Sequence, residues 1–190
     1  MSESIEIEFK TLITAKEFAH VQSFFQIEES GFHYQLNSYF DTEDSLLKQK
    51  KWGLRIRQLS DRGELTLKIP RTEGLLEVTD DLTVKEAEYY LQKQQLPDSG
   101  NVAKTLTAQG ILPQSLKMIA SLKTRRAEIK IQEGLLALDE SWYGKQHDFE
   151  LELEVADAEK GRQDFFDLLE KLQISYVPAP NKIVRAISEN

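Results

Sequence analysis

The sequence has no cysteine and only three histidines among its 190 residues. Without cysteine there can be neither a disulfide framework nor a thiolate metal site. His20, His33 and His147 are far apart in the chain, which argues against a histidine metal site or a histidine-based catalytic triad. Any metal ion would therefore be held by carboxylates, and carboxylate ligands favour Mg²⁺ or Mn²⁺.

Long apolar runs and an excess of positive charge are missing too. No run approaches the roughly 20 apolar residues of a membrane span, and the start MSESIEIEF lacks the apolar core of a signal peptide. With 24 Lys and Arg against 32 Asp and Glu, the net charge is −8, which argues against broad nucleic-acid binding. A local basic cluster that holds a small anion stays compatible with this charge. We expect a cytoplasmic protein with no membrane or nucleic-acid partner.

The composition itself is that of a globular protein, with 40% hydrophobic and 29% charged residues. The length suits a single domain over residues 1–190. Capping boxes at Thr14 and Thr83 each predict the start of a helix. Helices are expected over about 14–27, 83–94, 102–109 and 158–173, and the basic residues of 48–51 on a loop or short turn. Because strand patterns fill the rest without internal repeats, the sequence predicts an α+β fold.

The predicted strands carry charged residues on one face and apolar residues on the other. Within residues 4–10, Ile5, Ile7 and Phe9 share one face of a strand. Glu6, Glu8 and Lys10 share the opposite face. Later strands repeat the pattern with the sets Arg55 and Arg57; Thr66 and Lys68; Glu77, Thr79 and Asp81; Arg126, Glu128 and Lys130; and Glu150, Glu152 and Glu154. A last short strand is expected over 182–188.

The helices with apolar stripes need a sheet surface to cover. If they cover the apolar phase from outside, the charged phase faces the interior of a closed or nearly closed barrel, and eight strands leave room for one small ligand. Charges inside must pair, stay hydrated or bind a charged ligand, because burying them unpaired is costly. Arg and Lys suit phosphate oxygens, and clustered carboxylates suit a divalent cation. A metal–polyphosphate satisfies both, while strand faces that are merely solvated and salt-bridged remain the simpler alternative.

The charged motifs, taken in order, resemble the CYTH superfamily, the triphosphate tunnel metalloenzymes. The resemblance begins at Glu6-x-Glu8-x-Lys10 and continues along essentially the whole chain. It takes in Arg55-x-Arg57, Lys68 in TLK, Glu77 in LLEVT, Arg126 in TRR, Asp139 in ALD, the late ELELE segment and Lys182 in APNKIV. The length is similar to that of small stand-alone bacterial members. The resemblance implies an eight-stranded antiparallel β-barrel tunnel with helices packed outside, which acts on triphosphates with Mg²⁺ or Mn²⁺.

Read together with charge and strand phase, the resemblance also implies roles for individual residues. The carboxylates expected to bind metal are Glu6, Glu8, Asp139 and two of Glu150, Glu152 and Glu154. The cations expected to bind phosphate are Lys10, Arg55, Arg57, Lys68, Arg126 and Lys182. Lys10, Lys68 and Glu77 are also expected to act in catalysis. Arg125 and Arg185 are weaker candidates, because their strand phase is expected to point away from the interior.

The expected reaction is metal-assisted attack of water on the terminal phosphorus, with inorganic triphosphate as the preferred substrate. Hydrolysis of thiamine triphosphate and cyclisation of ATP by the same site stay open, as does a non-catalytic role in binding polyphosphate or a nucleotide triphosphate. A nucleotide substrate needs a stacking surface at the tunnel mouth, for which Tyr39, Trp52 and Trp142 are candidates, although each also suits a packing role. Besides the triphosphate, a second copy of the chain is an open partner.

Overall fold

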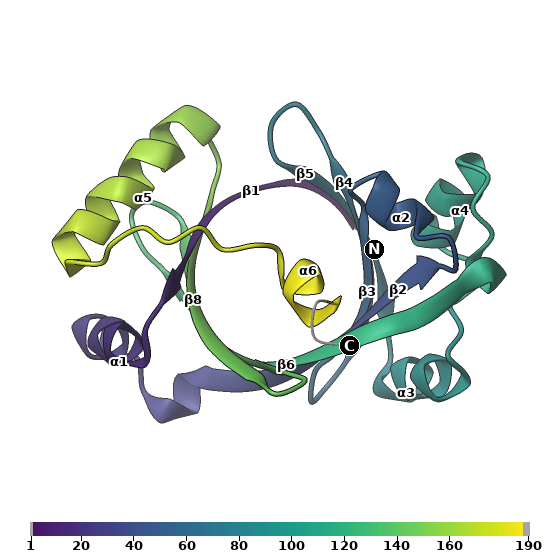
Figure 1. Ribbon diagram of the computed structural model, residues 1–190, viewed down its shortest axis with the longest axis horizontal. Coiled ribbons are helices and arrows are strands. Elements are labelled where there is room, and N and C mark those ends of the chain that lie inside the picture. Colours follow the sequence, from purple (N-terminus) through teal and green to yellow (C-terminus); the bar gives the residue numbers. More distant parts are fainter. Residues whose placement is uncertain (1, 188–190) are drawn as a thin grey trace.

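The computed structural model describes residues 2–187 and is built around a closed antiparallel β-barrel. Figure 1 looks into the ring of strands, with five helices around it and one inside it. The strands are β1 (Ser2–Ile13), β2 (Phe32–Thr42), β3 (Gly53–Gln58), β4 (Gly63–Pro70), β5 (Leu75–Leu82), β6 (Leu116–Lys130), β7 (Leu135–Tyr143) and β8 (Gln146–Val155). Around the barrel they follow the order β1-β5-β4-β3-β2-β6-β7-β8. The predicted eight-stranded barrel is thus confirmed.

The first strand closes the barrel by pairing with two different partners. Its residues Ser2–Glu6 pair with β5, whereas Ile7–Ile13 pair with β8. The turn between β4 and β5 must pass close to this strand, and Gly74 makes that approach. A Cβ atom at Gly74 would lie 2.3 Å from the carbonyl oxygen of Glu6, and the residue has a φ of +70°. Only glycine fits both the contact and the left-handed backbone.

Five helices cover the outside of the barrel. They are α1 (Ala15–Phe24), α2 (Leu46–Gln49), α3 (Val84–Lys93), α4 (Asn101–Ala108) and α5 (Ala158–Leu172). The predicted capping boxes at Thr14 and Thr83 are present, with Glu17 and Glu86 as their reciprocal partners. α1 and α5 pack on β1, β7 and β8, whereas α2, α3 and α4 pack on β2 to β5. No helix among residues 2–187 is long and apolar enough to cross a membrane.

The apolar phase of most strands faces these outer helices, as predicted, whereas Tyr34 and Leu36 on the outward phase of β2 are exposed. One core cluster joins Leu151 and Leu153 of β8 to Phe165 and Leu169 of α5. A second core cluster lies on the opposite side of the barrel, where Leu54 and Ile56 of β3 and Leu65 and Leu67 of β4 pack against α3 and α4. The two clusters therefore form a sleeve around the barrel, and the interior holds the polar phase together with a third, smaller apolar cluster at one end.

The C-terminal segment differs from its prediction. Residues 182–187 form the helix α6 (Lys182–Ile187) rather than a strand, and Ser188 lies outside the described residues. The apolar residues Ile183, Ala186 and Ile187 have the spacing of one helical face, which six residues cannot distinguish clearly from a strand pattern. The helical spacing also overturns the expectation for Arg185. It lies three residues after Lys182, so both cations project from the same side of the helix.

Two other boundaries moved by several residues. β6 begins at Leu116, five residues before the predicted start at Ser121, because its first residues pair with the end of β2. α1 ends at Phe24 rather than near Ile27, and the basic segment 48–51 begins inside the short helix α2. None of these differences changes which strand residues face the interior.

Candidate functional site

The side chains inside the barrel form two acidic groups and one basic group. We call Glu6, Glu8, Glu77 and Glu154 the β1 acidic cluster, Asp139, Glu150 and Glu152 the buried triad, and Arg55 and Arg57 the basic wall. The register brings members of different strands together: Glu8 pairs with Glu154, Lys10 with Glu152 and Lys68 with Glu77. Residues distant in sequence therefore share one interior, as the alternation predicts.

The β1 acidic cluster has too few cations for its charge. The Lys68 ammonium lies 2.5 Å from a carboxylate oxygen of Glu6 and 2.6 Å from one of Glu77. The Lys10 ammonium lies 2.6 Å from Glu8. Within residues 2–187, Glu154 makes no ion pair. Two ammonium groups thus serve four carboxylates, and two negative charges are uncompensated.

The pKa values of the cluster reflect this excess of negative charge. Burial raises the pKa of Glu6, and the charges of Glu8 and Glu77 add to the increase against the opposing effect of Lys68. Burial likewise raises the pKa of Glu154, with further increases from Glu77 and Glu8. Glu77 differs: burial would raise its pKa, but Lys68, Arg55 and Arg57 together outweigh burial and the pKa is lowered. Glu6 and Glu154 are therefore the carboxylates that gain most from an added cation.

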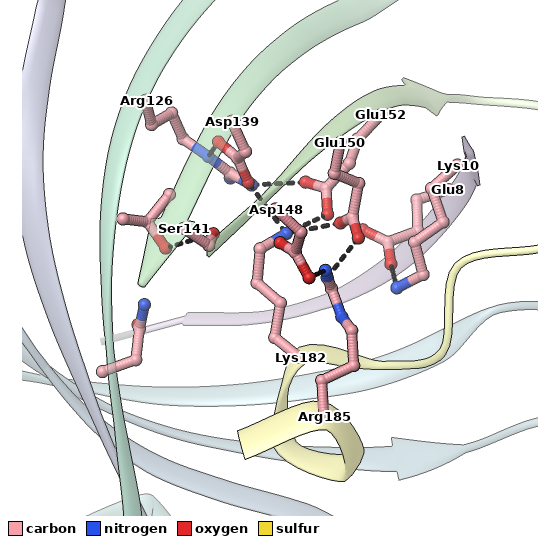
Figure 2. A network of polar contacts seen from close by, with 12 residues as sticks. Glu8, Lys10, Arg126, Asp139, Ser141, Asp148, Glu150, Glu152, Lys182 and Arg185 are labelled. Carbon is pink, nitrogen blue, oxygen red and sulfur yellow. Dashed lines mark hydrogen bonds and ion pairs between the residues drawn. The ribbon is translucent and has the colours of Figure 1, made fainter. Parts of the chain in front are cut away.

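The buried triad is compact, and it is already neutralised. Its three carboxylates offer ligand atoms that all lie within 4.8 Å of one another, which is a spacing suited to a metal. The ammonium of Lys182 occupies this position, however, at 2.8 Å from Asp139, 2.5 Å from Glu150 and 2.6 Å from Glu152. Figure 2 shows how Lys182 enters the triad from α6.

Two arginines complete the pairing of the triad. Arg126 donates to both carboxylate oxygens of Asp139, at 2.7 and 2.6 Å, and to Glu152. Arg185 of α6 donates to Glu150 and, at 2.6 Å, to Asp148 (Figure 2). Each carboxylate of the triad thus contacts at least one cation, and Arg185 is shared with Asp148. A metal ion in the triad would have to displace the Lys182 ammonium, so its charge balance resembles a structural ion-pair network more than a vacant metal site.

The three carboxyl groups of the triad differ in pKa. Burial, together with the neighbouring charge of Glu152, raises the pKa of Glu150 to about 8, although Lys182 opposes the shift. For Glu152 the effect of burial is outweighed by Lys182 and Arg126, and the pKa falls well below its ordinary value. Asp139 shows the same reversal, with Arg126 as the strongest opposing cation. Burial and the unequal cation contacts thus move the pKa values of the three carboxyl groups in opposite directions.

The basic wall has the opposite imbalance to the β1 acidic cluster, because its cations lack close carboxylate partners in the described part of the chain. Among the described residues no ion pair joins Arg55 to a carboxylate, and its buried Nε has no hydrogen-bond partner. Arg57 reaches Glu64 only at 4.0 Å and donates instead to the neutral side chain of Asn37. Burial lowers the pKa of Arg57, and the charges of Arg55 and Arg126 lower it further. Arg55 and Arg57 both lower the pKa of Glu77. The basic wall and the β1 acidic cluster therefore interact electrostatically.

The helix α6 enters one end of the barrel, which the sequence did not predict. Its apolar side, with Ile183, Ala186 and Ile187, packs on Tyr39, Ala120, Leu122 and Tyr143 from three strands. The preceding loop is tied to β1, where the Leu12 amide donates to the Val177 carbonyl at 3.0 Å. Figure 1 shows α6 within the ring of strands. The three-residue spacing of Lys182 and Arg185 was the available signal, and it fits a helical period and not strand alternation.

The aromatic candidates for stacking are all engaged in packing contacts, although Tyr39 lies opposite Arg55 in the register of β2 and β3. Tyr39 is 4% exposed and packs beneath α6. Trp142 stacks on His147, with ring centroids 5.1 Å apart, and lies below the ammonium of Lys123. Trp52 packs on the outer core and lines a cavity of about 390 Å³ outside the barrel wall. Arg125 pairs with Glu29 and Glu140, which agrees with its predicted outward phase.

Comparison with known proteins gives the same answer as the fold. The family model of the CYTH domain matches residues 4–187. The chain is 40% identical over 189 residues to "Putative triphosphatase YjbK" of Bacillus subtilis (strain 168), a match that covers all of this chain and 97% of the relative.

Two solved structures are also similar. One, described as a "putative adenylate cyclase" of Bacillus halodurans, has a TM-score of 0.91 at 39% identity and covers 97% of this chain and 98% of its own. The HpAC1 protein of Hippeastrum has a TM-score of 0.81 at 21% identity, covers 97% and 96%, and shares the fold. The ordered charged motifs, the closed barrel and these matches together show that the chain belongs to the CYTH domain family.

Proposed function

We propose that the protein is a metal-dependent triphosphatase whose preferred substrate is inorganic triphosphate. The observation that supports this most strongly is that the barrel interior, within residues 2–187, holds both arginines without close carboxylate partners and carboxylates in excess of their cations. Arg55 and Arg57 lack carboxylate partners, while the β1 acidic cluster carries two uncompensated negative charges. A ligand that combines a polyanion with a divalent cation satisfies both, whereas either ion alone satisfies one. The relative named a triphosphatase supports the same reading.

For the metal, the β1 acidic cluster fits better than the buried triad. Glu8 and Glu154 lie opposite each other in the register, and Glu6 projects from the same face of β1 as Glu8. Carboxylate oxygens are ligands that suit Mg²⁺ or Mn²⁺, and the two uncompensated negative charges of the cluster match the charge of a divalent cation. We therefore assign Glu6, Glu8 and Glu154 as the metal ligands among the six predicted. When bound, the metal offsets the charge that develops on the phosphate oxygens and promotes attack by water.

The side chains of the protein hold the substrate. Arg55 and Arg57 bind non-bridging oxygens of the triphosphate, and their planar forks suit two oxygens each. Lys10 and Lys68 exchange some of their contacts with Glu8 and Glu6 for phosphate oxygens once a metal neutralises those carboxylates. Glu77 keeps Lys68 oriented through the ion pair at 2.6 Å. Arg126 and Lys182, also predicted to bind phosphate, have carboxylate partners in this structure and contribute to the positive field.

The packing contacts of the three aromatic candidates favour inorganic triphosphate over a nucleotide. Of the three aromatic candidates, Tyr39 is covered by α6 and Trp142 and Trp52 contact outer residues. Cyclisation of ATP is the second candidate, since the Bacillus halodurans structure is described as a cyclase. Thiamine triphosphate and a purely binding role follow from the same site with less support.

One panel of assays distinguishes these functions. The purified chain is incubated with inorganic triphosphate, thiamine triphosphate or ATP, with Mg²⁺, Mn²⁺ or a chelator, and both phosphate and cAMP are measured. The proposal predicts phosphate release that is fastest from inorganic triphosphate and stops with chelator. Appearance of cAMP as the main product would favour the cyclase instead. Tight binding of every triphosphate without any turnover would contradict both enzyme functions.

A further inference from the structure

The interior of the barrel carries two buried amide side chains that the charged motifs do not include. Gln35 and Asn37 lie on the same face of β2 and are 2% and 0% exposed. Asn37 pairs in register with Arg57, and Gln35 with Thr124. These two amides therefore extend the basic wall along the neighbouring strand.

The chemistry of Arg57 fixes the orientation of the Asn37 amide. The Nε atom of Arg57 lies 2.9 Å from Asn37 and can only donate a hydrogen bond. The atom of Asn37 that faces it must therefore be the carbonyl oxygen Oδ1. The amino group Nδ2 then points elsewhere, and it has no hydrogen-bond partner among the described residues. Asn37 both anchors Arg57 and presents a spare donor.

Gln35 presents a second spare donor. Its Nε2 atom is buried and without a protein partner in the described part of the chain. The nearest hydroxyl in register, Thr124 Oγ1, is engaged with Ser141 Oγ at 3.1 Å. A buried donor without an acceptor lowers the stability of the folded state. β2 carries two such donors within three residues. Such a penalty is expected where a ligand supplies the missing acceptors.

Together these groups bring several hydrogen-bond donors to one part of the interior, three of them without a partner among the described residues. Arg55 and Arg57 offer guanidinium N–H groups, and Gln35 and Asn37 offer amide N–H groups next to them. Non-bridging phosphate oxygens are acceptors, so an anionic phosphate chain matches these donors. We propose that Gln35 and Asn37 bind non-bridging oxygens of the triphosphate directly, and that Asn37 also positions Arg57. This inference rests on the proposed function of the same site.

The variant Gln35→Met separates substrate binding from a structural role. Methionine keeps the length of the side chain and removes the unpaired donor without adding charge. The binding of metal-free inorganic triphosphate, measured by calorimetry with a chelator present, should weaken about ten- to hundredfold. The melting temperature of the free protein should stay the same or rise, because an unsatisfied donor has been removed. Unchanged binding, or weaker binding that comes with a lower melting temperature, would overturn the role of Gln35.

The variant Asn37→Asp tests the second residue while it keeps an acceptor for Arg57. The new carboxylate pairs with Arg57 and repels phosphate, so triphosphate affinity should fall by about a hundredfold or more. Gln58→Glu is the matched control, since it adds the same charge on the outward phase of the adjacent β3 and should leave affinity unchanged. Wild-type affinity in Asn37→Asp would refute its role. A wild-type protein that binds no triphosphate would instead refute the proposed function itself.

Discussion

At the scale of single residues, charge pairing distinguishes the carboxylates of the interior better than proximity does. Asp139, Glu150 and Glu152 approach one another most closely, yet each touches the Lys182 ammonium. Glu154 has no ion pair within residues 2–187, and burial and neighbouring carboxylates raise its pKa. The group that lacks partners is the one that gains from a metal ion.

Arg57 and Arg126 provide a matched test of this distinction. Arg57→Gln removes a cation that has no close carboxylate, so activity should fall about a hundredfold while the melting temperature hardly changes. Arg126→Gln leaves the fully buried Asp139 without its bidentate partner, and should lower the free energy of unfolding by about 3–5 kcal/mol. Phosphate release and thermal unfolding of both variants check the contrast. A loss of stability in Arg57→Gln as large as that in Arg126→Gln would contradict it.

The pH dependence of metal binding follows from the raised pKa values of Glu6 and Glu154. Mn²⁺ binds the deprotonated carboxylates, so protons compete with the metal as the pH falls through these pKa values. Since both pKa values lie above those of ordinary glutamates, affinity should begin to fall above the ordinary range of about 4.3. Mn²⁺ titrations from about pH 8 down to about pH 5 measure this. Glu154→Gln should bind more weakly with a shallower pH dependence, whereas a constant wild-type affinity would refute the assignment.

Much of the site could be predicted at this scale, because residues of the same parity in a strand lie on the same face of the sheet. Parity alone placed Glu6, Glu8, Arg55 and Arg57 inside the barrel. Parity could not say which of the late glutamates faces Glu8, since that depends on the register between β1 and β8. Gln35 and Asn37 were missed because neutral amides on a strand face are ordinary, and only the orphaned donors single them out.

At the scale of elements, α6 carries the main correction. The segment was predicted as a strand, and as a helix it brings Lys182 and Arg185 together into the acidic residues of β7 and β8. The six residues include β-branched side chains, which also suit a strand, so local preference could not decide the type. The tertiary contacts with Tyr39 and Leu122 decide it.

Removing the central ammonium tests the role of α6. Lys182→Met leaves the buried triad with two cations for three carboxylates, which should lower the free energy of unfolding by about 3–5 kcal/mol. Mn²⁺ should then restore part of the melting temperature of the variant, because the vacated position suits a divalent cation. Lys160→Met is the control: because its pair with Asp164 is exposed, the free energy of unfolding should hardly change. A Lys182→Met variant as stable as the wild type would contradict the pairing.

At the scale of the whole molecule, the fold reverses the usual arrangement of a small globular protein. The apolar core forms a sleeve between the barrel and the outer helices, and charges of both signs fill the centre. The alternation and the helical stripes were compatible with this inversion, and the resemblance to the CYTH superfamily was needed to predict it over solvated strand faces. The strand order and the closure of β1 on two partners come from long-range pairing, which no local pattern encodes.

Anomalous diffraction from crystals grown with Mn²⁺ and a non-hydrolysable triphosphate analogue tests the account most directly. The account predicts a manganese peak coordinated by Glu6, Glu8 and Glu154, with analogue phosphates on Arg55 and Arg57 and Lys182 still seated in the buried triad. A manganese peak among Asp139, Glu150 and Glu152, with Lys182 displaced, would contradict it.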